Sequence, residues 1–332
     1  MYNREEEILE QYEIEIRSTS KGRGALNCDT DKGTMLLKEF RGSKERAAFL
    51  YDILEFLSAE GFTAETILLS KEGEALLKDE AEGASFLLKT RFLGRECDVK
   101  SRDDILFAVQ TLARFHKIAG SCQNEIPDFL KADKNSLLKE YERHNRELNK
   151  VKNYIRNKNK KNEFELLFMK DYESCRVQAA ETTEQLKEQM LQLDPALLEQ
   201  MRGLCHGDYN QHNVIFSQGE WTVINFEQMT YDVMVCDLAN FIRKILEKYN
   251  WNTGLGLEMI TAYDNVRKLL PEELTQLYLR LSYPKKYWKI ANHYLSSRKA
   301  WISGRDIEKL KKVMEQEPQR RQFLKMLFCF TN

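Results

Sequence analysis

The segment of residues 204–228 constrains the fold of this chain more than any other. It opens with a polar loop that contains His206, Gly207, Asp208 and Asn213. A short apolar strand, a tight turn at 217–220 and a second strand follow, and the second strand contains Asn225 and Glu227. Because strand residues two apart point to the same face, these two side chains should share a face. The segment therefore predicts a hairpin that carries carboxylate and amide oxygens.

The rest of the sequence predicts an α+β fold in two parts. Residues 1–93 show short segments with glycine-containing turns, which predict an antiparallel meander and one helix capped by Ser43. The predicted strands are 12–17, 25–28, 34–40, 67–70 and 84–91. Residues 94–332 have a largely helical pattern, and the presence of only 15 glycines and 5 prolines favours long helices. We therefore predict an antiparallel-sheet N-terminal lobe, 1–93, and a mostly helical C-terminal lobe, 94–332.

The helical part contains a predicted helical insertion at about residues 128–194. Two charged helices are expected there, over 131–161 and 163–192, and we expect them to form an antiparallel pair. The first carries 11 basic and 4 acidic residues. A solvated helix face explains this excess better than a surface for an anionic partner.

The composition argues against several classes of protein. With 51 basic and 52 acidic residues the net charge is −1, which argues against a nucleic-acid-binding protein. No apolar run reaches the roughly 18 residues of a membrane span, and the first residues lack the apolar stretch of a signal peptide. The seven cysteines include no C-x-x-C pair, which is typical of a reduced, cytosolic protein without disulfides or a zinc site.

The polar loop resembles the catalytic loop shared by protein kinases and aminoglycoside phosphotransferases. In the small-molecule branch its pattern is H-G-D-x-x-x-x-N, which His206, Gly207, Asp208 and Asn213 match. Phosphoryl transfer needs a carboxylate that orients the acceptor hydroxyl and accepts its proton, and Asp208 fits this catalytic role. It also needs an oxygen ligand for Mg²⁺ a short loop away, and Asn213 fits that role. We expect His206 to brace the loop rather than to act as an acid or base.

Lys38 fits the nucleotide site of the same kind of enzyme. It lies on the third predicted strand, where kinase-like folds place the lysine that holds the α- and β-phosphates of ATP. The turn at Gly22 and Gly24 would lie over the nucleotide, and a plain hairpin explains this turn equally well. The helix after Lys38 should supply a carboxylate that pairs with the lysine. The candidates for that carboxylate are Glu45, Asp52 and Glu55.

A hinge for the adenine base is expected at the end of the fifth predicted strand. Lys89, Thr90 and Arg91 would form this hinge and meet adenine through backbone groups. The cofactors expected for such a site are ATP and Mg²⁺.

Five motifs, the loop motif among them, occur in the order found in the spore-coat-associated CotS family of endospore-forming Firmicutes. They are Gly94–Asp98, Leu112–His116, His206–Tyr209, Arg243–Lys248 and Tyr283–Lys289. The chain resembles this family over about residues 10–328. The resemblance implies a two-lobed protein-kinase-like fold, related to aminoglycoside and choline kinases, and association with the spore coat. It does not imply a known substrate.

Two residues outside the loop have roles that the pattern suggests. His116 ends the apolar face of a helix and is expected to pack in the core. Asp237 resembles the buried aspartate that holds the catalytic loop in such folds, and an ordinary helix N-cap explains this residue equally well.

One position departs from the active members of the wider superfamily. These carry aspartate in the strand pattern I-D-F/W-E, where it chelates Mg²⁺, whereas this chain has Asn225. An amide keeps one oxygen but loses the negative charge that this hard cation prefers. Glu227 would lend a carboxylate, so the predicted metal ligands are Asn213, Asn225 and Glu227.

Two hypotheses for the function follow. The first is an ATP-dependent phosphotransferase that acts on a small hydroxylated, sugar-like acceptor. The second is a pseudokinase that serves as a structural or interaction module in spore coat assembly, with other coat proteins as partners. Asn225 favours the second hypothesis, whereas Lys38, Asp208 and Asn213 favour the first. Either places the protein in the mother-cell cytoplasm or in the spore coat.

Overall fold

A computed structural model describes residues 2–22, 24–79, 83–122, 125–217, 219–296 and 304–331. Contacts between residues divide the chain into two compact units. The first contains residues 1–131 and 204–231, and the second contains residues 132–203 and 232–332. The fold class is the predicted one, an α+β fold with an antiparallel sheet in its N-terminal part and helices in most of its C-terminal part.

The division into units does not coincide with the predicted boundary at residues 93 and 94. The reason is a set of hydrogen bonds that join the 204–228 segment to the N-terminal part of the chain. Val223 N donates to Thr63 O at 3.2 Å, and Glu65 N donates to Val223 O at 3.1 Å. The hydroxyl of buried Tyr209 donates to Ala108 O at 2.6 Å. The loop and hairpin are therefore built into the same unit as the N-terminal sheet.

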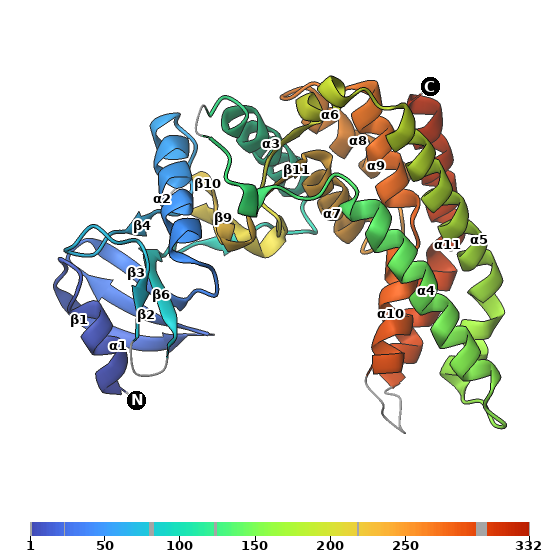
Figure 1. Ribbon diagram of the computed structural model, residues 1–332, viewed down its shortest axis with the longest axis horizontal. Helices are drawn as coiled ribbons and strands as arrows, with labels where there is room; N and C mark the ends of the chain where they lie inside the picture. The colour runs from blue at the N-terminus through green and yellow to red at the C-terminus, as the bar shows by residue number, and fades with distance from the viewer. Residues whose placement is uncertain are drawn as a thin grey trace. The chain divides into compact units, whose positions relative to one another are not determined.

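The first unit is centred on a six-stranded antiparallel sheet with the order β1-β2-β3-β6-β4, in which β5 also pairs with β6 (Figure 1). The strands are β1 (Ile16–Gly22), β2 (Ala25–Thr30), β3 (Gly33–Glu39), β4 (Ile67–Leu68), β5 (Leu77–Lys78) and β6 (Ser85–Thr90). The predicted meander is confirmed, although its first strand begins at Ile16 rather than at residue 12.

One face of this sheet is covered by a helix that the sequence analysis did not predict, α1 (Tyr2–Leu9). Ile8 and Leu9 of this helix pack in one buried cluster with Met35 and Leu37 of β3. Because side chains alternate along a strand, Lys38 points to the opposite face. The alternation of β3 thus separates the apolar core from the face that carries the lysine.

The first unit also contains two longer helices. Helix α2 (Lys44–Ala59) begins where expected, since the Ser43 hydroxyl accepts a hydrogen bond from Arg46 N at 3.3 Å. Helix α3 (Arg102–Ala119) buries Ile105, Val109 and Leu112.

The 204–228 segment forms the predicted loop and hairpin. Strands β9 (Val214–Ser217) and β10 (Glu220–Val223) pair antiparallel, and β7 (Arg95–Glu96) pairs with the other edge of β9. Strand β8 (Arg202–Cys205) precedes the loop and pairs with β11 (Thr230–Val233). Short 3₁₀ turns occur at Gln211–Asn213 and Phe226–Gln228.

The second unit is helical. Its helices are α4 (Ser136–Arg156), α5 (Glu163–Gln192), α6 (Pro195–Met201), α7 (Val235–Leu246), α8 (Thr253–Asp264), α9 (Pro271–Ser282), α10 (Lys285–Ser296) and α11 (Gly304–Thr331). Figure 1 shows α4 and α5 running side by side, and α4 also contacts α10 while α5 contacts α11. The predicted helical insertion is therefore a helical pair whose core includes Tyr141, Val151 and Phe168.

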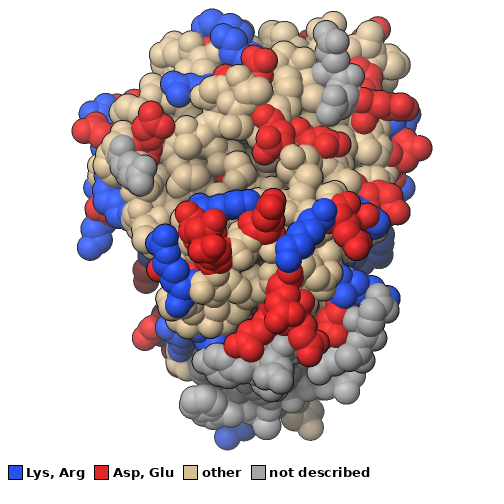
Figure 2. Space-filling view, turned by 90° about the vertical axis from the view of Figure 1, so that its left-hand side faces the viewer, with Lys and Arg blue, Asp and Glu red and all other residues tan. Residues whose placement is uncertain are grey.

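The surface carries both signs of charge. On the face shown in Figure 2, acidic and basic side chains lie beside one another and are not separated by sign. Within the described ranges, no helix is both long enough and apolar enough to cross a membrane.

Candidate active site

The loop that precedes the hairpin is fixed by His206 and Gly207. His206 is fully buried, and its Nε2 lies 3.0 Å from Ile224 O while its Nδ1 accepts from Asp208 N at 3.2 Å. Since Nδ1 accepts this bond, Nε2 carries the proton and donates to Ile224 O. His206 thus holds the loop against the hairpin, as predicted.

Gly207 has a φ of +81°, and a Cβ added there would lie 1.9 Å from Gln228 O. We predict that Gly207→Ala lowers the free energy of unfolding by about 3 kcal/mol, because it combines a left-handed backbone with a clash against another backbone segment. Gly219→Ala is a matched control, since Gly219 has a φ of +89° with no atom near its added Cβ. Urea unfolding of both variants measures the difference, and equal losses would contradict a close approach at Gly207.

Asp208 and Asn213 lie together at the end of the loop. The side-chain amide of Asn213 donates to Asp208 O at 2.8 Å and lies 3.4 Å from Asp208 Oδ2. Asn213 is buried, whereas Asp208 is exposed. The predicted catalytic residue is therefore held at its backbone, and its side chain is exposed.

Two lysines meet the segment that follows the hairpin. Lys38 Nζ lies 2.7 Å from Glu227 Oε1 and 3.1 Å from Asn225 Oδ1. Lys89 Nζ makes the same two contacts at the same distances and also pairs with Glu65 Oε2 at 2.8 Å. The side chain of Lys38 is 32% exposed, whereas that of Lys89 is 2% exposed. One lysine faces the solvent and the other lies behind it.

The carboxylate partner of Lys38 is thus Glu227, and the prediction that it comes from the following helix is wrong. Among the ion pairs and hydrogen bonds of the described residues, none joins Lys38 to Glu45, Asp52 or Glu55. Helix α2 instead contributes Arg46, whose guanidinium donates to Glu227 O at 3.2 Å and to Met229 O. Glu65 was not predicted as a site residue, because it lies in a loop and belongs to no recognised motif.

Asn225 differs from the predicted strand residue. Strand β10 ends at Val223, and Asn225 has a φ of +65°, the left-handed conformation that asparagine tolerates better than most residues. The argument that Asn225 and Glu227 share a strand face is therefore wrong. The two lysines, rather than strand periodicity, bring their oxygens together.

The orientation of the Asn225 amide follows from its neighbours. An ammonium group only donates, so the oxygen of Asn225 must face Lys38 and Lys89. Its Nδ2 then faces Asn213 and donates to Asn213 Oδ1 at 2.8 Å. Both amide ends of Asn225 are therefore engaged by protein groups.

The ion cluster remains charged at neutral pH. Burial by itself would raise the pKa of Glu227, but the ammonium groups of Lys89 and Lys38 lower this pKa to about 2. Burial would lower the pKa of Lys89, and the carboxylates of Glu65 and Glu227 outweigh it and raise this pKa. The opposite charges stabilise one another inside the first unit.

We predict that acid destabilises the protein through Glu227. Its pKa of about 2 in the folded state lies below the ordinary value of 4.5, so its stabilising effect is full above pH 4.5 and is lost as the pH falls toward 2. The full effect corresponds to about 3 kcal/mol. Urea unfolding between pH 5 and pH 2 should show a shallower pH dependence for Glu227→Gln than for the wild type. Identical slopes would contradict the lowered pKa.

A cavity of about 780 Å³ opens beside these residues in the first unit. Its lining consists of Gly24, Lys38, Glu39, Phe40, Arg41, Gly42, Arg46, Asp208, Asn225, Glu227 and Gln228. The structure thus brings Lys38, Asp208, Asn225 and Glu227 to one cavity, as predicted. Asn213 is buried and contacts Asp208 and Asn225.

The predicted hinge residues do not line this cavity. Lys89 and Thr90 lie on β6, and Thr90 N donates to Thr66 O at 2.9 Å. Arg91 N donates to Thr34 O, also at 2.9 Å. These two N–H groups are used within the sheet, so an adenine contact at Thr90 or Arg91 would have to involve another backbone group.

The predicted metal ligands do not fit Mg²⁺ in their present arrangement. Asn213 Oδ1 accepts from Asn225, and Asn225 Oδ1 and Glu227 Oε1 each accept from two ammonium groups. Mg²⁺ needs free oxygen ligands at close to octahedral geometry. A divalent cation at these oxygens would also be repelled by both lysines.

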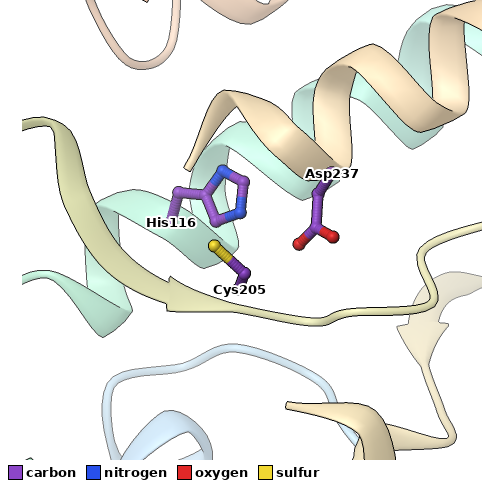
Figure 3. A group of neighbouring side chains, drawn as sticks. All are labelled: His116, Cys205 and Asp237. Atoms are coloured by element: carbon purple, nitrogen blue, oxygen red, sulfur yellow. The ribbon is translucent and has the colours of Figure 1, made fainter. Parts of the chain in front are cut away.

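Three further buried side chains are shown in Figure 3. His116 of α3 and Cys205 at the end of β8 point toward one another, and His116 is buried as predicted. Asp237 is also buried, but it lies inside α7 and the N-cap residue is Met234, so the N-cap explanation is wrong. All three have other interactions within the protein, and we assign them to the core.

Comparison with known proteins supports the fold. The chain matches the phosphotransferase enzyme family over residues 22–269. It is 22% identical over 330 residues to spore coat protein S of Bacillus subtilis (strain 168), with 97% of this chain and 93% of that protein covered.

Two solved structures are similar to the whole chain. An aminoglycoside phosphotransferase from Alicyclobacillus acidocaldarius has a TM-score of 0.83 at 19% identity and covers 97% of this chain and 95% of its own. An amicoumacin kinase in complex with AMP-PNP and Ca²⁺ has a TM-score of 0.63 at 15% identity, with 96% and 93% covered. These likenesses establish a kinase-like fold.

Proposed function

Because the chain belongs to the phosphotransferase enzyme family, we propose that it binds ATP and transfers the γ-phosphoryl group to a small hydroxylated, sugar-like acceptor. The observation that carries this proposal is that Lys38 and Asp208 line the same cavity. A cation for the phosphates and a carboxylate for the acceptor are the two groups that such a reaction needs at one site. The amicoumacin kinase structure, which holds a nucleotide analogue, supports the choice of nucleotide.

Lys38 is suited to hold the phosphates. Its side chain is 32% exposed and lines the cavity, and its ammonium nitrogen lies 2.7 Å from Glu227 Oε1. Arg41 and Arg46 add two cationic side chains to the same wall. We infer that these three residues bind the polyphosphate of ATP.

Asp208 is suited to orient the acceptor. The acceptor oxygen forms a bond to the γ-phosphorus as the bond from this phosphorus to the β,γ-bridging oxygen breaks, and ADP leaves. The hydroxyl proton passes to the Asp208 carboxylate. The hydrogen bonds from Asn213 to Asp208 O and from Asp208 N to His206 keep this carboxylate in place during the step.

Before Asn213 Oδ1, Asn225 Oδ1 and Glu227 Oε1 could bind Mg²⁺, each would have to lose the hydrogen bonds that it now accepts. The contacts of Asn225 also favour the second function, a pseudokinase that binds a nucleotide without turnover and serves as a module in spore coat assembly. The similarity to spore coat protein S supports a place in the spore coat or in the mother-cell cytoplasm where the coat is made.

Incubation of the protein with γ-labelled ATP and a panel of sugars, amino sugars and polyols tests the enzyme proposal. We expect label on at least one acceptor, with ADP formed in equal amount. Nucleotide binding without transfer to any acceptor would favour the pseudokinase. Lack of nucleotide binding would contradict both.

A further inference from the structure

We propose that Lys89 and Lys38 take the place of the divalent cation at this site, so that ATP binds without Mg²⁺. The inference rests on the proposed function, because it concerns the same nucleotide. It goes beyond that function by giving the side chain of buried Lys89 a role other than that of the predicted adenine hinge.

The first support is the sharing of acceptors. The two ammonium nitrogens contact the same pair of atoms, Asn225 Oδ1 at 3.1 Å and Glu227 Oε1 at 2.7 Å. These atoms belong to residues that the loop pattern predicts to be metal ligands. Two ammonium groups therefore already contact oxygens that the pattern assigns to a metal.

The second support is the anchoring of Lys89. Its side chain is 2% exposed, and Glu65, which is itself buried, pairs with it at 2.8 Å. The other carboxylate oxygen of Glu65 accepts from Phe226 N at 3.1 Å, in the residue that follows Asn225. Glu65 thus joins Lys89 to the turn that carries Asn225, and Lys89 is a fixed part of the site.

The third support is the amide at position 225. The amide accepts from the lysines with its oxygen and donates to Asn213 Oδ1 with its nitrogen, at 2.8 Å. A carboxylate at this position would have no proton to donate at neutral pH and would leave Asn213 Oδ1 free for a metal. Asn225 therefore affects two predicted metal ligands. It puts an amide in place of a carboxylate at position 225, and it occupies Oδ1 of Asn213 with a hydrogen bond.

The charge at position 225 also affects the binding of a polyphosphate without a metal. The cavity is lined by the cations Lys38, Arg41 and Arg46 and by the carboxylates of Glu39, Asp208 and Glu227, so its charges are balanced in number. Arg46 is fixed by the carbonyls of Glu227 and Met229. An aspartate at position 225 would add one negative charge beside the phosphates. Its replacement by asparagine lowers the repulsion that a metal normally offsets.

The test is calorimetric titration of ATP into the purified full-length protein, in buffer with EDTA and in buffer with MgCl₂. We expect the two dissociation constants to agree within about threefold. The matched variant is Asn225→Asp, which has nearly the same shape and tolerates the left-handed backbone. In this variant we expect weaker binding in EDTA and tightening of about tenfold or more with MgCl₂.

Tightening of the wild-type complex by about tenfold or more with MgCl₂ would overturn the inference and leave the proposed function intact. An Asn225→Asp variant as indifferent to MgCl₂ as the wild type would overturn the role given to the amide. Failure of the wild type to bind ATP in either buffer would instead contradict the proposed nucleotide site, and the inference with it. The two failures are therefore distinguishable.

Discussion

Replacement of Asp208 by asparagine should lower the rate of phosphoryl transfer by at least about 100-fold while ATP affinity changes by less than about threefold. The amide has nearly the same shape, so the loop contacts from Asn213 and His206 to the Asp208 backbone should persist. It cannot accept the hydroxyl proton, and it lacks the negative charge that orients the acceptor. A stopped time course with γ-labelled ATP and the accepted sugar measures the rate, and titration of ATP measures the affinity.

Asp103→Asn provides the control for this substitution. Asp103 lies in the first turn of α3, is exposed, and does not line the cavity. The control should keep the wild-type rate within about twofold, since it makes the same chemical change away from the site. An Asp208→Asn rate within threefold of the wild type would show that this carboxylate is not the proton acceptor.

Replacement of Lys89 by methionine should lower the free energy of unfolding by about 3–5 kcal/mol. Methionine fills the space but leaves buried Glu65 without its ammonium partner, and Glu227 loses one of two. Lys38→Met is the control at the neighbouring position. Since the Lys38 side chain is 32% exposed, water compensates for its loss and the expected cost is about 1 kcal/mol.

Urea unfolding of both lysine variants measures the two costs. The double variant Lys89→Met with Glu65→Leu should recover much of the stability, because it replaces a buried ion pair by apolar groups rather than breaking it. If Lys89→Met does not fold, recovery of a folded protein in the double variant is the expected result. Equal losses of unfolding free energy in Lys89→Met and Lys38→Met would contradict a buried ion cluster in which Lys89 is desolvated and Lys38 is partly exposed.

The loop and the hairpin could be predicted from the sequence because their signals are local. The H-G-D-x-x-x-x-N pattern places Asp208 and Asn213 by spacing alone, and the alternation of 34–40 places Lys38 on a strand. The helical pair of the second unit is also predictable, since its apolar residues recur at helical spacing over long stretches.

The ion cluster could not be predicted in the same way. Glu65 and Lys89 are 24 positions apart in the sequence, and Glu227 follows 138 positions after Lys89. Only the pairing of β6 with its neighbours and the fold of the turn after β10 bring them together. Helix α1 was missed for a related reason, because its apolar Ile8 and Leu9 gain their meaning from the sheet on which they pack.

The central claim is that Lys38 holds a nucleotide at this cavity, and ATP titration of the wild type and of Lys38→Met tests it most directly. The account predicts a dissociation constant of about 1–100 μM for the wild type and weakening by at least about tenfold in the variant. Folding of the variant is checked by its urea unfolding curve. A wild type that binds no ATP, or a folded Lys38→Met variant that binds it as tightly as the wild type, would contradict the claim.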